Sequence, residues 1–466
     1  MRESIRARIR EGLRRRQPAF TIVGGGIYTA LALEALISGF YVVITRSLAP
    51  IFFAVYGMSM TEIVGLNLLA NVVALAMALA IYNFSKTFVL GNTKLKLVLA
   101  HGIERVCWGM IPVAAFFYPK LLPLVYTLAV TATVPTGILI NVAIFNLPED
   151  RVKKLMAHRN ALGAVSSVIG QLTMIAALAL ISTKLKYLYL YLLASSVGLM
   201  ATILMGVTPI PRVERLELGA EQEALVKASS SFLFFTSFLA SGAILGVVWA
   251  PHLIKDLHAP DYIAASIGFI QTITSIGASI FWQGKDYRMY RAAVAGVALS
   301  PLLIMLVPSA YAQLGIAALY AFTNTGANFL ASFIFADISR RISFFRASTM
   351  LTSAWILSQV WGLGISYLLL VLGVPIYGVF AACMGFIAIA TFIALTALPE
   401  VAVVPPHISN AYARQLHNLA ISSYSYVMFT VKSYAVLTLR LLALALAILL
   451  LFIIYRVAYY IAVLSG

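Results

Sequence analysis

Apolar stretches about as long as a bilayer is thick recur along this chain, and no other feature limits its fold as strongly. The hydrocarbon core of a membrane is about 30 Å thick, so a crossing helix needs about 20 mainly apolar residues. We expect crossings at residues 20–45, 60–84, 96–118, 121–146, 160–183 and 185–208, then at 229–254, 262–284, 291–308, 312–336, 348–372 and 375–398. A further, very apolar stretch covers residues 434–464, which brings the predicted number of crossings to thirteen.

The composition agrees with a chain whose surface faces lipid. Hydrophobic residues make up 62% of the sequence and charged residues only 11%, which excludes a water-soluble globule with an ordinary surface. The sequence therefore predicts an all-α polytopic membrane protein. Its expected parts are a basic N-terminal segment (1–19), a six-helix bundle (20–208), a central loop (209–228), a second six-helix bundle (229–398), a linker (399–433) and an additional transmembrane helix (434–466).

The Lys and Arg residues predict the orientation, because basic loops are retained on the cytoplasmic side. If the N-terminus is cytoplasmic, 25 of these residues fall in cytoplasmic segments and five in the opposite loops. Those five are Arg46, Lys120, Lys184, Lys186 and Lys255. We therefore expect a multi-pass protein of the cell membrane with a cytoplasmic N-terminus and an external C-terminus.

The N-terminal run is strongly basic and contains Arg14, Arg15 and Arg16 before the first apolar stretch. A twin-arginine export signal is one interpretation, but the following stretch is too long for a signal-peptide core and lacks a clear small-residue cleavage site. We expect an uncleaved first helix whose basic anchor contacts anionic lipid headgroups. In a membrane protein the net charge of +17 reflects such basic segments, and no nucleic-acid partner is expected.

An internal repeat with an offset of 187 residues relates the two halves. One loop runs from Asp150 to Arg159 and the other from Asp337 to Arg346, and both contain Asp, two residues, two basic residues, four residues and Arg. Chance similarity between charged loops is the alternative, but six apolar stretches on each side of a central loop favour a true repeat. Because the offset covers an even number of crossings, the halves are expected to have the same topology.

This plan resembles the major facilitator superfamily over residues 18–400. The segment 284–291, after the eighth crossing, also supports the resemblance. It is similar to a degenerate form of that family's loop motif of glycine, aspartate and basic residues. The corresponding loop after the second crossing, 84–96, has basic residues but no acid, and the fifth crossing lacks the pattern of the family's drug antiporters. The resemblance implies two bundles around a site near the midplane that is exposed alternately to each side.

Glu34 is the leading candidate for substrate binding or coupling, because ionisable groups at bilayer depth are costly and are functional candidates by default. We expect it near the middle of the first crossing. In a central cavity its carboxylate could bind a cationic substrate group or take up a coupling proton. The alternative is a protonated side chain that hydrogen-bonds to a neighbouring helix.

Two adjacent ionisable residues, Glu104 and Arg105, lie about 12 Å into the third crossing. Neighbouring residues on a helix do not face each other, so we expect each of them to have a different partner. Salt bridges between helices, or snorkelling toward the cytoplasm, are favoured over contact with substrate.

Neutral polar residues form a second candidate set for the substrate site, and both halves contribute to it. Its members are Asn67, Asn71, Asn141, Gln171, Gln271, Asn324, Asn328 and Gln359. The pairs Asn67 with Asn71 and Asn324 with Asn328 have helical spacing, so each pair shares a face. For any one residue, a hydrogen bond between helices is the alternative role. Core packing is preferred over substrate stacking for Trp249, Trp355 and Trp361.

Charged residues near the cytoplasmic helix ends are candidates for gating. We expect ion pairs that break and re-form as the halves move, with plain solvated loops as the alternative. The candidates are Asp150, Arg159, Asp286, Arg288, Asp337 and Arg346, together with Glu104 and Arg105.

The last helix, 434–464, carries Arg440 and Arg456 toward its two ends with no polar group between them, so an anchoring or oligomer-contact role is expected.

Sequence motifs of catalysis and of cofactor binding are missing. The chain has no phosphate-binding loop of the Gly-x4-Gly-Lys-Ser/Thr type, its histidines are scattered, and Cys107 and Cys383 lie in apolar stretches. We expect no enzyme activity, no metal and no cofactor.

The function expected from these observations is secondary-active transport of a small, unidentified solute by alternating access, with proton coupling as an option. The alternative is a non-transporting membrane receptor or membrane-complex subunit built on the same fold. A polar cavity between the halves would favour transport, and a closed apolar centre would favour the alternative.

Overall fold

A computed structural model describes residues 24–145, 147, 149–210, 222–339, 344–398, 401–419 and 422. The basic N-terminal segment and the predicted helix at 434–464, with its oligomer contact, lie outside these residues. The first half contains α2 (Gly24–Tyr56), α3 (Met60–Asn83), α4 (Ser85–Val89), α5 (Thr93–Phe117), η1 (Pro119–Leu121), α6 (Leu122–Phe145), α7 (Glu149–Leu180) and α8 (Lys186–Val207). The second half contains α9 (Gln222–Lys255), α10 (Asp261–Trp282), α11 (Tyr287–Val297), α12 (Leu299–Leu306), α13 (Ala312–Ser339), α14 (Phe344–Val371) and α15 (Ile376–Ala397).

These helices form a polytopic membrane fold. Within the described residues, 11 helical segments are long and apolar enough to cross a membrane, and one of them, Met289–Leu306, combines α11 with α12. Helix α13 packs against α10 and α11 among these segments. A helix satisfies its backbone hydrogen bonds within itself, which is why apolar segments of this length are helical in lipid. The predicted all-α membrane fold is confirmed.

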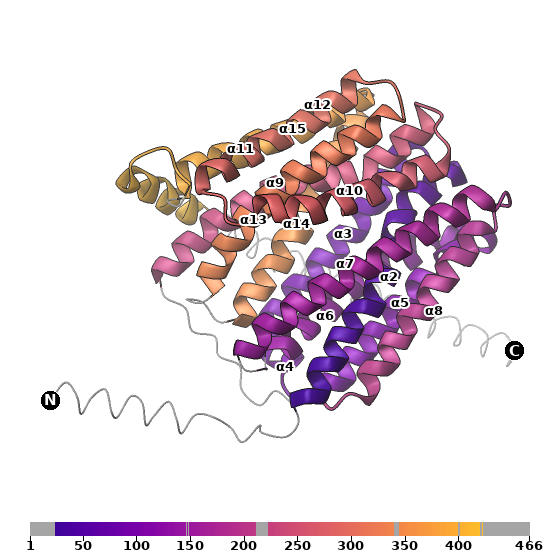
Figure 1. The fold of residues 1–466 in the computed structure, drawn as a ribbon, viewed down its shortest axis with the longest axis horizontal. Coiled ribbons are helices and arrows are strands. Elements are labelled where there is room, and N and C mark those ends of the chain that lie inside the picture. Colours follow the sequence, from indigo (N-terminus) through magenta and orange to yellow (C-terminus); the bar gives the residue numbers. More distant parts are fainter. Residues whose placement is uncertain are drawn as a thin grey trace, which may run out of the picture.

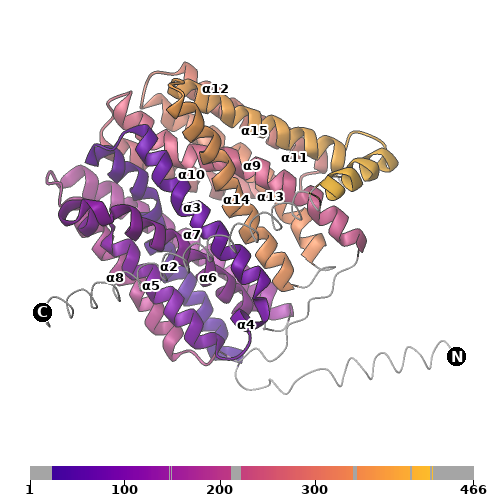
Figure 2. The same cartoon turned by 180° about the vertical axis from the view of Figure 1, so that it is seen from behind.

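The helices lie in two groups. Figure 1 shows α2 to α8 on one side and α9 to α15 on the other, and the reverse view in Figure 2 shows the same division. Helices α9, α10 and α14 of the second group pack against α2, α3 and α7 of the first. We call the end of the bundle where α2 begins the N-terminal end, and the other the opposite end.

Helix α2 is longer than the sequence predicts. The predicted first crossing ends at residue 45, whereas α2 continues through the apolar residues 48–56 and contains Pro50. Proline is tolerated in a crossing helix when neighbouring groups satisfy the freed backbone. The helix stops before Gly57, whose φ of +101° favours glycine. The prediction that Arg46 lies in an external loop is therefore wrong, because this residue lies inside a crossing helix.

The two aspartates of the internal repeat lie on opposite sides of the corresponding connections, α6 to α7 and α13 to α14. Asp150 lies in the first turn of α7, after the connection that follows α6, whereas Asp337 lies near the end of α13, before the next connection. The segment 150–159, predicted as a loop, belongs to α7 and is helical. The repeat therefore marks corresponding regions of the two halves, and its aspartates do not occupy equivalent places.

Small residues bring α2 and α7 into close contact. A Cβ atom added to Gly39 would lie 2.7 Å from the carbonyl oxygen of Gly163, and one added to Gly170 would lie 2.6 Å from Cγ1 of Val43. Lipid tails are as apolar as leucine, so helices in a membrane associate largely through close packing of this kind. The crossing also brings the carboxylate of Glu34 on α2 to the side chains of α7.

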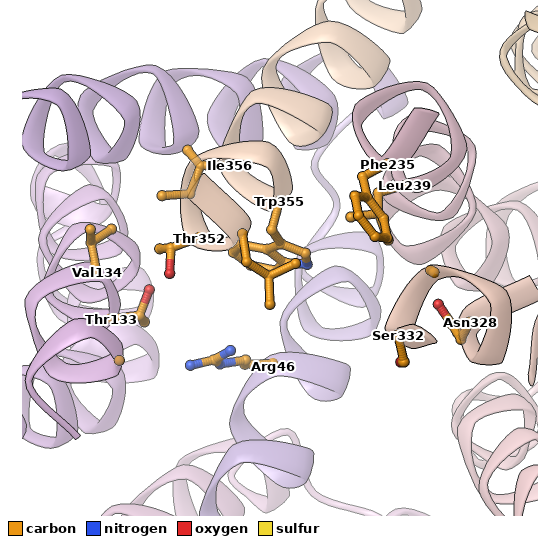
Figure 3. A pocket seen from close by; sticks show the side chains of 13 residues that line it. Arg46, Thr133, Val134, Phe235, Leu239, Asn328, Ser332, Thr352, Trp355 and Ile356 are labelled. Carbon is orange, nitrogen blue, oxygen red and sulfur yellow. The ribbon is translucent and has the colours of Figure 1, made fainter. Parts of the chain in front are cut away.

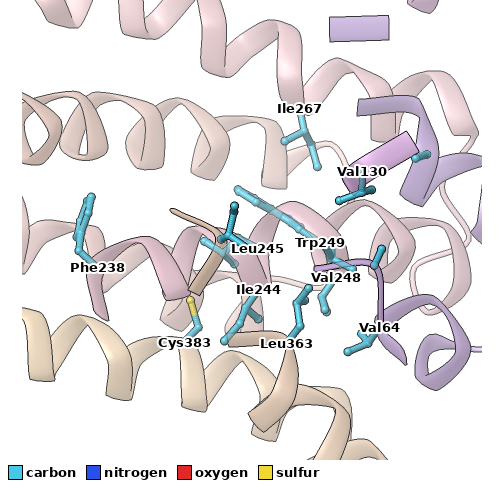
Figure 4. Close-up of a cluster of buried hydrophobic side chains, with 14 of the residues drawn as sticks. Val64, Val130, Phe238, Ile244, Leu245, Val248, Trp249, Ile267, Leu363 and Cys383 are labelled. Atoms are coloured by element: carbon cyan, nitrogen blue, oxygen red, sulfur yellow. The ribbon is translucent and has the colours of Figure 1, made fainter. Parts of the chain in front are cut away.

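An apolar core joins the two groups of helices. Figure 4 shows part of it, where Val64 of α3 and Val130 of α6 lie near Val248 and Trp249 of α9. A smaller cluster is built from the first group alone, and Ile27, near the start of α2, belongs to it. The two halves therefore share one apolar core, whereas the smaller cluster near the start of α2 belongs to the first group.

Gly39→Ala is expected to destabilise the protein by about 1–3 kcal/mol, because the added methyl group meets the backbone of α7, which cannot move aside as a flexible side chain can. Gly163→Ala is the matched control, since the nearest atom to its added Cβ, the carbonyl oxygen of Ala35, is 3.7 Å away. Unfolding of the purified protein in detergent compares the two variants. Equal effects of the two substitutions would contradict the tight crossing.

Candidate functional site

A cavity of about 530 Å³ lies between the two groups of helices, and both groups line it. Its volume is typical of small-molecule sites, which occupy roughly 300–1,000 Å³. Figure 3 shows Thr133 and Phe235 on opposite sides, with Trp355 between them and Arg46 below in this view. The lining residues are Arg46 of α2; Thr133, Val134 and Gly137 of α6; Phe235 and Leu239 of α9; Asn328, Ala331 and Ser332 of α13; and Leu351, Thr352, Trp355 and Ile356 of α14.

The lining is mainly apolar and carries a few polar groups. Among the lining residues Arg46 is the charged one, and none is acidic. Trp355, which the sequence assigns to core packing, is 40% exposed and stands in the cavity. Of the predicted polar set, Asn328 lines the cavity. The site therefore offers one cation, an indole face, an amide and several hydroxyl groups.

Arg46 reaches the cavity from α2. Its side chain is 38% exposed, and its Nη2 atom lies 3.4 Å from Oε1 of Glu104. Its Nε atom is buried and has no hydrogen-bond partner. The sequence pattern did not reveal this role, because the predicted first crossing ends at residue 45. The signal that could have placed Arg46 correctly is the apolar run 48–56, which prolongs the crossing.

Glu104 of α5 forms ion pairs with two arginines. Its Oε2 atom accepts a hydrogen bond from Nη1 of Arg105 at 2.7 Å, while its Oε1 atom faces Arg46. Each residue has its own partner on α2, as predicted, with Arg46 for Glu104 and Ser38 for Arg105. The sequence did not predict that the two also pair with each other, which their side chains are long enough to do beside the helix. The Arg105 guanidinium also lies over the Tyr41 ring, 4.8 Å from its centroid. Gly198 leaves room there, since an added Cβ would lie 2.8 Å from each of these side chains.

Glu34 is buried among basic side chains and is not one of the cavity-lining residues. Its Oε2 atom lies 2.7 Å from Nη1 of Arg159, and its Oε1 atom lies 3.4 Å from Nε2 of His101. Ser38 donates to Oε1 of Glu34 at 2.5 Å and accepts from Nη2 of Arg105 at 3.1 Å. The structure thus places Glu34 as the counter-ion of Arg159, and its role in substrate binding or coupling stays a prediction.

These contacts join into one network of alternating charges. We call it the charge chain, and its members are Arg46, Glu104, Arg105, Glu34 and Arg159, with Ser38 between Arg105 and Glu34. It runs from the cavity across α2, α5 and α7. Ionisable groups inside a membrane protein usually pair in this way, because an isolated charge is costly in a medium of low polarity.

Two of the other predicted polar residues, Asn141 and Asn67, bond to a neighbouring helix. Nδ2 of Asn141 donates to Oγ of Ser348 at 2.9 Å and so links α6 with α14 across the two groups. Asn67 accepts a hydrogen bond from the Tyr126 hydroxyl at 2.6 Å, and Asn71 donates to the carbonyl of Asn67 at 2.8 Å. The lining of the cavity also does not include Gln171, Gln271, Asn324 or Gln359. A role in substrate binding stays a prediction for each of them.

The predicted gating residues are only partly described. Asp286 is the N-cap of α11, where its carboxylate accepts a hydrogen bond from the backbone N–H of Met289 at 3.1 Å. Arg159 belongs to the charge chain. The side chains of Asp150, Arg288, Asp337 and Arg346 lie outside the described part of the structure.

A polar contact joins the two groups at the opposite end. Oδ2 of Asp261, the first residue of α10, lies 2.6 Å from Nζ of Lys186 and accepts a hydrogen bond from the Tyr187 hydroxyl at 2.6 Å. We call these three residues the end clamp. The sequence shows an acid and a Lys–Tyr pair at the starts of two crossings, but it does not tell which crossings are neighbours. Sequence patterns therefore did not predict the end clamp.

Glu34→Gln should destabilise the protein, because it removes the carboxylate that faces the mostly buried Arg159. Breaking one side of a buried ion pair costs about 3–5 kcal/mol. The double variant Glu34→Met/Arg159→Met removes both charges and is expected to regain much of this loss. Thermal unfolding in detergent measures both effects. An unchanged melting temperature for the single variant would favour a protonated Glu34 instead.

No protein-family model and no curated protein sequence matches this chain. Solved structures match it at low sequence identity. A crystal structure of the nucleoside transporter NupG covers 78% of this chain and 97% of its own length, with a TM-score of 0.57 and 14% identity. A crystal structure of a D-xylose-proton symporter covers 81% of this chain and 98% of its own, with a TM-score of 0.58 and 14% identity.

A third similar structure is that of a bacterial homologue of the iron transporter ferroportin in an inward-facing state. It covers 79% of this chain and 97% of its own length, with a TM-score of 0.57 and 13% identity. At such identities the likeness is one of fold. Together with two groups of crossing helices around a shared cavity, it shows that this chain has the fold of the major facilitator superfamily, which its sequence resembles.

Proposed function

We propose that this protein is a secondary-active transporter that carries a small solute across the membrane by alternating access. The observation that carries the proposal is the cavity lined by both groups of helices. Thr133 and Gly137 lie near the middle of α6, and Leu239 lies near the middle of α9. A site at the interface of two similar halves can face either side of the membrane as the halves rock against each other. The similar structures of a nucleoside transporter and a sugar–proton symporter support this class.

The contacts between the groups support a rocking motion. At the opposite end they include the end clamp and a close approach of Gly65 to Tyr367, whose ring would lie 2.9 Å from an added Cβ. Toward the N-terminal end, the hydrogen bond between Asn141 and Ser348 connects the groups. We propose that the contacts of the opposite end open when the cavity turns to that side. The closing contacts would then form at the N-terminal end, where the predicted gating residues lie.

The proposal includes an orientation and a location. We place the N-terminal end in the cytoplasm and the end clamp on the outer side of the cell membrane, as the distribution of Lys and Arg predicts. The basic N-terminal segment is then next to anionic lipid headgroups. We assign proton coupling to Glu34 and His101, because these two titratable side chains are in contact.

The polar groups of the cavity favour transport over the alternative of a receptor or complex subunit. A protein that uses this fold only as a scaffold needs no guanidinium, amide or hydroxyl at its centre, and a closed apolar centre would be more stable. The cavity instead contains Arg46, Asn328 and the hydroxyls of Thr133 and Ser332. Convergent polar groups in an otherwise apolar pocket are typical of a ligand site.

Gly137→Phe is expected to reduce uptake to background, because its ring would occupy the cavity between the halves. An added Cβ at Gly137 has no atom within 4 Å, so the substitution can be accommodated in the structure. Gly277→Phe is the matched control: it also has no atom within 4 Å of an added Cβ, but it lies on an exposed face of α10 away from the cavity.

The measurement is uptake into proteoliposomes from a panel of labelled sugars, nucleosides, amino acids, organic acids and amines. It is made with and without a pH gradient, using the unaltered protein and both glycine variants. Uptake that Gly137→Phe abolishes and Gly277→Phe retains supports transport through this cavity. Absence of uptake for the whole panel, with correctly folded protein, would favour the receptor or subunit function.

Asp261→Asn is expected to open the opposite end more often, because Asp261 makes the polar contacts of the end clamp between α10 and α8. A hydrogen bond to a charged group contributes about 1.5–3 kcal/mol, so the open population should rise about tenfold or more. Asp256→Asn is the matched control, since this aspartate pairs with His252 within the second group alone.

Labelling of a cavity cysteine measures the opening. Ser332→Cys is introduced after replacement of Cys107 and Cys383. A membrane-impermeant maleimide is then applied on the side of the membrane that the opposite end of the bundle faces. Faster labelling in Asp261→Asn than in Asp256→Asn supports the role of the end clamp. Equal labelling rates in the two variants would show that other contacts hold this end closed.

A further inference from the structure

We propose that the cavity recognises a small organic anion, a solute in which one carboxylate or phosphate is joined to an aromatic or other apolar body. This inference names the substrate class of the transport function proposed above and rests on it. Arg46 binds the anionic group, and Trp355 with Phe235 contacts the apolar body. The cavity-lining residues of the described structure include no carboxylate that would repel such a solute.

The charge chain holds an excess of positive charge, and that excess faces the cavity. It contains three guanidinium groups, those of Arg46, Arg105 and Arg159, and two carboxylates, those of Glu34 and Glu104. Arg105 and Arg159 each lie 2.7 Å from a carboxylate oxygen, whereas Arg46 lies 3.4 Å from its partner. The least neutralised cation is therefore the one that lines the cavity.

Arg46 also has N–H donors that its hydrogen bond to Glu104 does not use. A guanidinium carries five N–H donors in a planar fork that matches a carboxylate or a phosphate. The hydrogen bond to Glu104 uses Nη2, while the buried Nε atom has no partner. The side chain lines the cavity and is 38% exposed, so its remaining exposed N–H groups can donate to an anion bound there.

The remaining lining suits an apolar body. Trp355 is 40% exposed in the cavity, and its indole offers a flat face for stacking beside the apolar Phe235 and Leu239. The hydroxyls of Thr133 and Thr352 can bind further polar atoms of the solute. A cationic amine finds no carboxylate among these residues and meets the Arg46 charge, so the cavity disfavours it.

The decisive experiment compares matched probes on the unaltered, purified protein. Indole-3-acetate is compared with indole-3-acetamide, and octanoate with octanamide, because each pair differs in charge and hardly in shape. Each carboxylate should bind at least about tenfold more tightly than its amide, as expected for a charge-assisted hydrogen bond. Whether the indole or the octyl pair binds more tightly distinguishes an aromatic metabolite from a fatty acid. Binding is measured by the shift of the melting temperature over a range of probe concentrations.

Variants test whether Arg46 causes this preference. Arg46→Gln should remove the difference between carboxylate and amide, and Arg46→Lys should keep part of it because the charge remains. Lys285→Gln is the matched control, since Lys285 is an exposed cation that lies over the Phe281 ring and does not line the cavity. The comparison in the unaltered protein decides the proposal even if Arg46→Gln does not fold.

Equal binding of carboxylate and amide overturns the proposal, and so does a carboxylate preference that persists in a folded Arg46→Gln protein. Uptake into proteoliposomes separates this outcome from failure of the transport function. Uptake of a neutral or cationic solute that Gly137→Phe blocks and Arg46→Gln leaves unchanged would retain transport and overturn the anion class. Binding of the carboxylates without uptake of any solute would retain the anion site and contradict transport.

Discussion

The pairing of buried charges constrains the first half of this protein more than any other interaction. Glu34 and Arg159 meet because α2 and α7 cross closely at Gly39, and Glu104 meets Arg46 because α5 lies beside the same helix. Sliding one of these helices by a turn would separate a carboxylate from its guanidinium in a medium of low polarity, at a cost of several kcal/mol. The charges therefore set the register in which these helices pack.

That register has a consequence for the proposed function. The charge chain begins at the cavity, where Arg46 is shared between Glu104 and the open space, and it continues to Arg159 on α7. An anion that binds Arg46 competes with Glu104, so occupation of the cavity would alter the contacts that hold α2 and α5 together. In an alternating-access protein this would link substrate binding to the helices that move. The end clamp, which joins α8 to α10, is one of the contacts between the halves that such a motion would break.

Much of the fold could be predicted because the membrane makes strong demands on the sequence. Apolar stretches of about 20 residues mark most crossings, and the repeat around Asp150 and Asp337 indicates two related halves. The site was harder to predict. Glu34 and Asn67 are conspicuous in the sequence because they are polar at membrane depth, yet Glu34 pairs with Arg159 and Asn67 with Tyr126, away from the cavity lining. A polar residue shows that it needs a partner, and the sequence does not say whether the partner is a helix or a solute.

The sequence by itself determined that the chain crosses the membrane many times, that its halves share a topology and that several charges must be buried. It could do so because hydrophobic length and charge are properties of local segments. Only the tertiary structure decided that Arg46 faces a cavity, that Glu104 pairs with two arginines, and that Asp261 meets Lys186. These outcomes depend on which helices lie side by side and at what rotation, and that depends on close packing between residues far apart in the chain.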